Sequence, residues 1–165
     1  MDKKVIIICT ILTVLILVIG VFWISSTNTV LPQIEASQNA KAYTVDATSA
    51  DWSQIPMYKG DVIKIFRIKN TGTDVLKLFN IKTSCHCTKA FVTINGTDSP
   101  SFGMEGISSW VGEVAPGKEV KLTVDFDPAY HGQSGTGPIT RFISVETNDK
   151  ANSKLTFTVT GNVYK

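Results

Sequence analysis

Cysteine is scarce in this 165-residue chain, which has one residue at Cys9 and two more at Cys85 and Cys87. Cys9 lies inside a long apolar run, so only two cysteines remain for the rest of the chain. Two cysteines form at most one disulfide, which excludes the small secreted domains held together by several bridges. The folded part must therefore be stabilised by packing.

Basic clusters are also absent. The 16 basic and 14 acidic residues give a net charge of +2, and the positive charges are spread along the chain. Domains that bind nucleic acid carry concentrated positive charge, so we expect no nucleic-acid partner. No nucleophile elbow, glycine-rich phosphate loop or paired carboxylates accompany the cysteines, and we therefore expect a protein that is not an enzyme.

Charge is missing altogether from residues 5–24, an apolar run of 20 residues. A helix of this length covers the roughly 30 Å hydrocarbon core of a bilayer at about 1.5 Å per residue. Lys3 and Lys4 precede the run, and the next basic residue is Lys41. The positive-inside rule then places the N-terminus in the cytoplasm and the rest outside. We predict a single-pass cell-membrane protein whose C-terminal domain is extracytoplasmic.

A cleaved signal peptide is the competing interpretation of this run. The apolar core of a signal peptide is usually about 7–15 residues long, and a small-x-small cleavage site follows it closely. Here the run is longer, and Ser25, Ser26 and Thr27 come directly after it. We therefore prefer an uncleaved anchor.

The chain divides into three parts. Residues 1–24 form a cytoplasmic stub and the transmembrane anchor. Residues 25–40 are polar, rich in small side chains and include Pro32, as in an exposed linker. Residues 41–165 are long enough for one domain with its own core and too short for two.

Beyond the anchor the hydrophobic residues alternate with polar ones, which is typical of strands with one buried face. The alternation is clearest over residues 119–127 and 154–163. Further strands are predicted at 62–69, 75–83 and 141–147, and weaker ones at 42–45 and 89–94. About seven short strands separated by turn residues predict an all-β, immunoglobulin-like β-sandwich behind one N-terminal transmembrane helix.

Four spaced motifs carry a family resemblance: Asn70-Thr-Gly72, Cys85-His-Cys-Thr88, Ala115-Pro-Gly117 and Asn148-Asp149. Together they resemble a bacterial domain-of-unknown-function family related to the abnormal-spindle/Hydin and major-sperm-protein immunoglobulin-like domains, over about residues 60–163. The resemblance implies an exported seven-strand sandwich with no assigned reaction. The chain departs from the family at His86, where glycine is common, and in a long insertion at 95–110.

Cys85 and Cys87 are the first candidates for chemistry. In an extended strand, side chains two residues apart project to one face about 6.6 Å apart. A disulfide needs Cβ atoms about 3.5–4.5 Å apart, so the pair can join directly only if the chain bends. A metal ion suits the wider gap better. The alternatives are a buried structural thiol pair and a strained disulfide, and His86 would point to the opposite face.

Met104 and His131 are two further donors in segments that are predicted to be loops. Thiolate, thioether and imidazole together favour Cu(I), whereas Zn²⁺ would accept the cysteines and one histidine without the methionine. Each has a simpler interpretation, with Met104 filling a gap under a loop and His131 lying in a surface turn. Counting strand directions does not decide whether the four donors converge.

The leading functional hypothesis is therefore an extracytoplasmic Cu(I)-binding protein for copper handling, with Cys85, Cys87, Met104 and His131 as ligands. An adhesion or assembly module with a protein partner in the cell envelope is the alternative. A thiol-redox protein is a second alternative, although the helix N-terminus that usually lowers the pKa of a catalytic thiol is lacking. Arg141 is interpreted as a solvated strand end.

Overall fold

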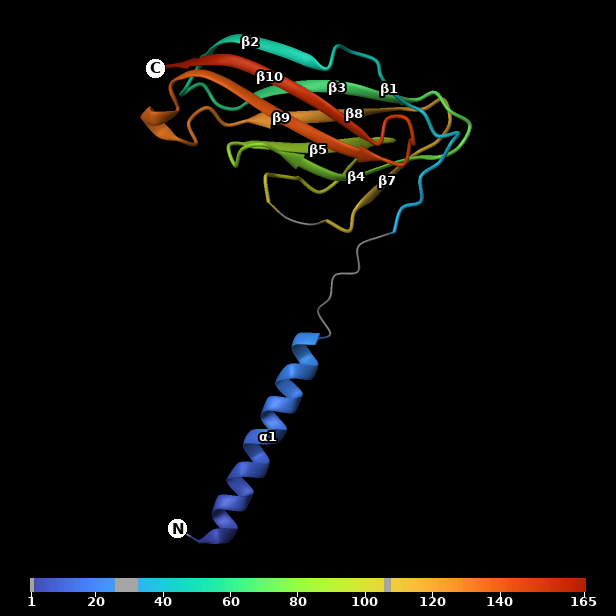
Figure 1. The fold of residues 1–165 in the computed structure, drawn as a ribbon. Coiled ribbons are helices and arrows are strands. Elements are labelled where there is room, and N and C mark those ends of the chain that lie inside the picture. The colour runs from blue at the N-terminus through green and yellow to red at the C-terminus, as the bar shows by residue number, and fades with distance from the viewer. Residues whose placement is uncertain (1, 26–32, 106–107) are drawn as a thin grey trace. The chain divides into compact units, whose positions relative to one another are not determined.

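The computed structural model describes residues 2–25, 33–105 and 108–165. The chain separates into two units, Met1–Val30 and Leu31–Lys165. The first contains the helix α1 (Lys3–Ser25), and the second contains the strands (Figure 1).

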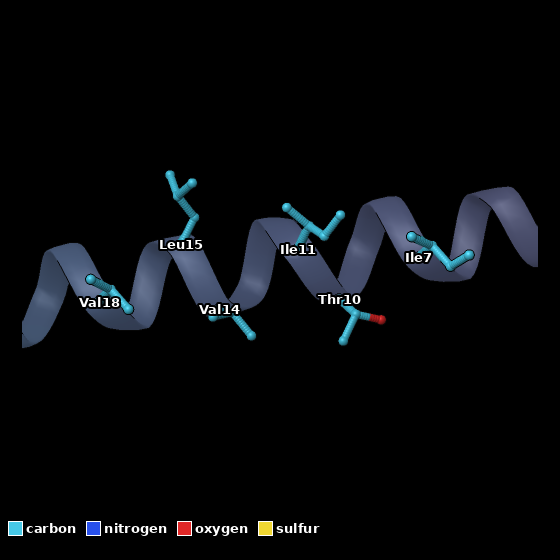
Figure 2. Close-up of a pocket in the computed structure, with 6 residues that line it drawn as sticks. All are labelled: Ile7, Thr10, Ile11, Val14, Leu15 and Val18. Carbon is cyan, nitrogen blue, oxygen red and sulfur yellow. The ribbon is translucent and has the colours of Figure 1, made fainter.

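Helix α1 is long and apolar enough to cross a membrane. Its window Lys3–Gly20 has a mean hydropathy of 2.4 and no buried residue, and a signal sequence near the N-terminus has the same properties. Figure 2 shows Thr10 among apolar side chains along this helix. The Thr10 hydroxyl donates to the carbonyl of Ile6 at 2.6 Å, and that of Thr13 to Thr10 at 2.9 Å. Both hydroxyls are thus satisfied within the helix, as a lipid environment requires.

Two five-stranded sheets form the second unit (Figure 1). In spatial order, the first sheet contains β1 (Ala42–Thr44), β3 (Val62–Asn70), β8 (Glu119–Phe126), β5 (Thr88–Ile94) and β6 (Thr97–Asp98). The second contains β2 (Ser49–Pro56), β10 (Lys154–Tyr164), β9 (Gly137–Thr147), β4 (Leu76–Thr83) and β7 (Val111–Val114). A short 3-10 helix, η1 (Gly132–Gly135), lies between β8 and β9. The predicted all-β sandwich is confirmed.

All seven predicted strands are present, and β2, β6 and β7 are additional. Strand β2 lies at the edge of its sheet and pairs in parallel with β10. It contains Ser53 with a φ of 56°, and most of its side chains are exposed or only partly buried, so it has no regular buried face. These irregularities hide β2 from a search for period-two patterns.

The main core lies between the two sheets. Phe66 of β3 and Phe157 of β10 are fully buried, and their rings are 4.8 Å apart. Val120 and Leu122 of β8 point into the same core, whereas Lys121 between them is exposed. The alternating sequence therefore produces this burial directly, because successive side chains of a strand point to opposite faces.

The segment before β1 already packs on the domain. The backbone of Ser37 pairs with Asn148 and Lys150, and Ala40 is fully buried. Gly72 passes so close to Asn39 that a Cβ at this position would overlap the Asn39 carbonyl. Residues 37–40, which the sequence places in the linker, thus contact the folded domain.

A smaller core closes the other part of the sandwich and positions the site described next. Its members are buried apolar residues from strand ends and from the turn after β4. They are Ile55, Met57, Cys87, Phe126, Ile139 and Val163. Trp52, which the main core also contacts, stacks on Phe126 with ring centroids 5.7 Å apart.

Candidate functional site

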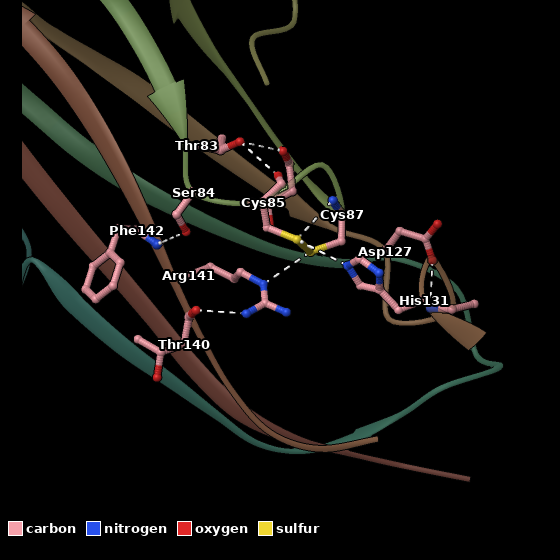
Figure 3. Close-up of a disulfide and its surroundings, with 11 residues drawn as sticks. Thr83, Ser84, Cys85, Cys87, Asp127, His131, Thr140, Arg141 and Phe142 are labelled. Atoms are coloured by element: carbon pink, nitrogen blue, oxygen red, sulfur yellow. Dashed lines mark hydrogen bonds between the residues drawn. A yellow bond between two sulfur atoms is a disulfide. The ribbon is translucent and has the colours of Figure 1, made fainter. Parts of the chain in front are cut away.

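A tight turn brings Cys85 and Cys87 together. Strand β4 ends at Thr83 and β5 begins at Thr88, and the amide of Thr88 donates to the Cys85 carbonyl at 3.1 Å. The turn shortens the distance between the two cysteine Cα atoms to 5.3 Å, and their sulfurs form a disulfide (Figure 3). The bend on which direct pairing depends is therefore present, and the structure shows the oxidised pair.

Hydrogen bonds hold this turn on three sides. The amide of Ser84 donates to the carbonyl of Phe142 on β9 at 2.9 Å, and the amide of Phe142 donates to Ser84 Oγ at 2.9 Å. The carbonyl of Cys87 accepts from the amide of Asp127 at 2.9 Å. Thr83 Oγ1 donates to the carbonyl of Thr88 at 2.9 Å. The turn is thus joined to both sheets, so the sulfurs have a defined position.

His131 reaches the disulfide from the loop after β8. Its Nε2 atom lies 3.4 Å from Cys85 Sγ (Figure 3). The backbone turns here through Gly132, which has a φ of 56°. A Cβ at Gly135 would come within 3.0 Å of His131 Cβ, so this close approach favours glycine. The two glycines that follow His131 therefore let the loop fold back over the sulfurs.

Arg141 approaches the other sulfur from β9. Its Nε donates to Cys87 Sγ at 3.1 Å, its guanidinium lies 5.7 Å from the ring centroid of Phe126, and Nη1 donates to the carbonyl of Thr140 (Figure 3). Burial lowers the pKa of Arg141 from its usual value, but a guanidinium remains charged near neutral pH. The interpretation of Arg141 as a solvated strand end is wrong, because the turn after β4 folds onto its side chain.

The three predicted donors that converge are Cys85, Cys87 and His131. Their ligand atoms all lie within 4.8 Å of one another. Cys87 is only 2% exposed, Cys85 is partly buried and His131 is exposed. Once the disulfide is reduced, two thiolates and an imidazole nitrogen would form a donor set that suits Cu(I) or Zn²⁺.

His86 lies between the two cysteines in the sequence, and Met104 lies in the insertion. The Nε2 atom of His86 is 3.4 Å from a carboxylate oxygen of Glu105. Met104 follows Gly103, whose carbonyl accepts from the amide of Thr83 at 3.1 Å, and its side chain is 41% exposed. The backbone of the insertion thus runs beside the end of β4, and ligation by Met104 stays a prediction.

A cavity of about 230 Å³ lies beside Cys87. Asp61, Asp125, Asp127 and Lys89 are among its lining residues. Burial raises the pKa of Asp125, and the charges of Asp61 and Asp127 raise it further against the opposing charge of Lys89. Within the described parts of the chain, Asp125 Oδ1 is a buried oxygen without a hydrogen-bond partner. The cavity beside Cys87 is therefore acidic.

Arg141 is the site residue that sequence reasoning missed. It begins the strand predicted at 141–147 and is one of two arginines in the chain. Those features carry no information about a residue 54 positions away. A buried Cys87 in contact with a charged residue is a relation that only the packing of β9 against the turn creates.

Comparison with protein families gives a match, described as "Protein of unknown function (DUF1573)", over residues 43–97. This stretch is one third of the 165-residue chain and includes Asn70, Gly72 and both site cysteines. His131 and Arg141 lie outside it. A search of the curated proteins found no match.

Solved structures share the fold. A protein of unknown function from Porphyromonas gingivalis W83 has 20% sequence identity and a TM-score of 0.59, and the match covers 79% of this chain and 50% of that protein. This chain thus spans about half the length of that relative. The protease VesB of Vibrio cholerae has 10% identity and a TM-score of 0.50, over 75% of this chain and 32% of the protease.

The ASH/PapD-like domain 7 of human CEP192 is also similar, with 16% identity and a TM-score of 0.48 over 84% of this chain and 96% of that domain. At these identities the likeness concerns the fold alone. The resemblance expected from the motifs is confirmed: over residues 43–97, including the Cys-His-Cys turn, this chain matches the family of unknown function DUF1573.

Proposed function

We propose that this chain is a membrane-tethered, extracytoplasmic binding protein whose reduced Cys85 and Cys87, together with His131, bind Cu(I). The observation that carries the proposal is the convergence of their three ligand atoms within 4.8 Å. Strand order alone does not require it, because His131 comes from a loop 46 residues after Cys85.

The oxidised pair must first open. A two-electron reduction by a thiol reductant breaks the disulfide, and the sulfurs then separate from about 2 Å to nearly 4 Å across a bound metal. The turn can accommodate this change on the side of Cys85, which is partly exposed. The site is therefore expected to bind metal only in its reduced state.

Charge also favours a monovalent soft ion. Two thiolates and one Cu(I) carry a net charge of −1, and the guanidinium of Arg141 lies in contact with Cys87 to balance it. The soft thiolate ligands would favour Cu(I) over hard metal ions. The helix α1 would keep the site near the membrane surface.

The test uses the full chain in detergent, reduced and loaded with Cu(I) without oxygen and then desalted. About one copper per chain is expected, and replacing both cysteines by serine should remove it. His131→Ala should weaken Cu(I) binding, measured by competition with a chromophoric chelator. The matched control is His86→Ala, because His86 faces Glu105. Equal copper retention in the double serine variant would overturn the proposal.

Topology needs a separate experiment. In intact cells, a membrane-impermeant maleimide should label Cys85 after reduction if the domain is extracytoplasmic. Labelling only after the cells are broken would contradict that location.

A further inference from the structure

The two sulfurs of the disulfide have different surroundings. Cys87 is 2% exposed and packs with Phe126 and Ile139 in the smaller core. Cys85 is partly exposed and faces the exposed His131. A thiolate attacks one sulfur of a disulfide and expels the other. An incoming thiol can therefore reach Cys85, and Cys87 is the sulfur placed to leave.

We propose that this pair is a thiol–disulfide exchange centre that oxidises a dithiol of a protein partner, with Cys85 attacked and Cys87 expelled. The proposal goes beyond copper binding and does not depend on it, because the exchange uses the oxidised, metal-free pair. The centre acts stoichiometrically, one disulfide per chain, until a disulfide of the same compartment oxidises it again.

The exchange has two steps. First, one thiolate of the partner attacks Cys85 Sγ, so a mixed disulfide forms, the bond between the cysteines breaks, and Cys87 leaves with the electron pair. Second, the other thiolate of the partner attacks its own first sulfur and releases Cys85. Two electrons and two protons pass from the partner dithiol to the cysteine pair, and the partner gains one disulfide.

Arg141 is the positioning residue for the first step. Its Nε already lies 3.1 Å from Cys87 Sγ, and a charge-assisted hydrogen bond strengthens as negative charge develops on that sulfur. The hydroxyl of Thr88, 3.6 Å from the same sulfur, can add a second donor. These side chains supply what a helix N-terminus supplies in many redox thiols.

Some of the other charged groups near the pair stabilise a thiolate there, and others destabilise it. His131 lies next to Cys85 and can stabilise the second leaving sulfur. Asp61 and Asp127 line the cavity beside Cys87 and oppose a thiolate there, while Lys89 favours it. Arg141 is in direct contact with the sulfur, so its removal should have the largest effect.

The first experiment measures the equilibrium of the pair. The full chain with Cys9→Ser is equilibrated in detergent, without oxygen and with a metal chelator, in buffers of reduced and oxidised dithiothreitol. Arg141→Gln should shift the equilibrium about tenfold toward the disulfide, which corresponds to about 30 mV. Arg141→Lys should recover part of the shift. Arg67→Gln, at the chain's other arginine, is the matched control and should behave as the unsubstituted chain.

The second experiment identifies the reactive sulfur and does not require an arginine variant to fold. Cys87→Ser, which leaves Cys85 free, should form a mixed disulfide with cystamine at least tenfold faster than Cys85→Ser, as followed by mass spectrometry. Equal or reversed rates would overturn the proposal, as would an unchanged equilibrium in a folded Arg141→Gln chain. Neither readout involves copper, so a failure of the proposed copper binding is recognised separately.

Discussion

Arg141 donates a hydrogen bond to the sulfur of Cys87 at 3.1 Å, across 54 residues of sequence. The contact places a permanent positive charge against the buried member of a disulfide whose other member faces His131. Both proposals for this site depend on that arrangement. A cation beside Cys87 stabilises its thiolate, whether the thiolate holds a metal or leaves during exchange.

Met104 is predicted to supply a thioether ligand from the segment that runs beside Thr83. Met104→Leu keeps the side-chain volume and removes the sulfur, so Cu(I) affinity should fall about tenfold while Zn²⁺ affinity stays unchanged. Chelator competition measures both values. Met57→Leu is the control, because Met57 is 1% exposed within the smaller core. Unchanged Cu(I) affinity in Met104→Leu would leave a three-ligand site.

The acidic cavity beside Cys87 should select positively charged exchange partners. Reduced protein is expected to react faster with cystamine, which is cationic, than with the neutral 2-hydroxyethyl disulfide. Asp61→Asn should reduce the ratio of the cystamine rate to the 2-hydroxyethyl disulfide rate, because it removes a negative charge that attracts cystamine. The ratio should also depend less on salt, since salt screens the attraction between opposite charges. The control is Asp98→Asn on the exposed strand β6. Stopped-flow rates at two ionic strengths give the comparison, and a ratio near one in the unsubstituted chain would contradict the prediction.

Asp149 should make the stability of the domain dependent on acid pH. Burial raises its pKa, but hydrogen bonds from Asn152, Ala42 and Ala151 and the charge of Lys41 outweigh this, so the pKa is lowered from 3.8. The stabilisation is therefore present above the unfolded pKa and is lost as pH falls through the lower folded value.

Asp149→Asn should accordingly lower the free energy of unfolding at pH 7 by about 1–3 kcal/mol and flatten its decline at acid pH. Urea denaturation at a series of pH values measures this. Glu113→Gln, an exposed position on β7, is the control and should leave the profile unchanged. If the free energy of unfolding of Asp149→Asn declined at acid pH as steeply as that of the unsubstituted chain, another group would cause the acid sensitivity.

Gly72 should tolerate no side chain. A Cβ there would overlap the backbone of Asn39 and crowd Lys41, so Gly72→Ala should lower the free energy of unfolding by about 3 kcal/mol. Gly103→Ala provides the contrast, because a Cβ there meets nothing within 4 Å. Thermal denaturation of the two variants should differ clearly, and equal melting temperatures would mean that residues 37–40 do not hold their place on the domain.

The sandwich could be predicted because its determinants are local. Alternation along 119–127 and 154–163 assigns side chains to two faces, and β8 and β10 follow almost to the residue. Strand β2 was not predicted, because this edge strand, with Ser53 at a positive φ, has no regular alternation of apolar and polar residues. The start of β9 at Gly137 was not predicted, because glycine and proline at this position are typical of a loop.

Local patterns in the sequence are enough to predict the apolar helix, the alternating strands and the family motifs, and the scarcity of cysteine singles out Cys85 and Cys87. The packing of the folded domain closes these cysteines into a disulfide at the turn after β4, brings His131 onto one sulfur and places Arg141 against the other. The two kinds of feature differ in the range of the interactions that produce them. Periodicity reports which face a side chain takes, whereas the meeting of residues 46 and 54 positions apart depends on how loops and sheets pack.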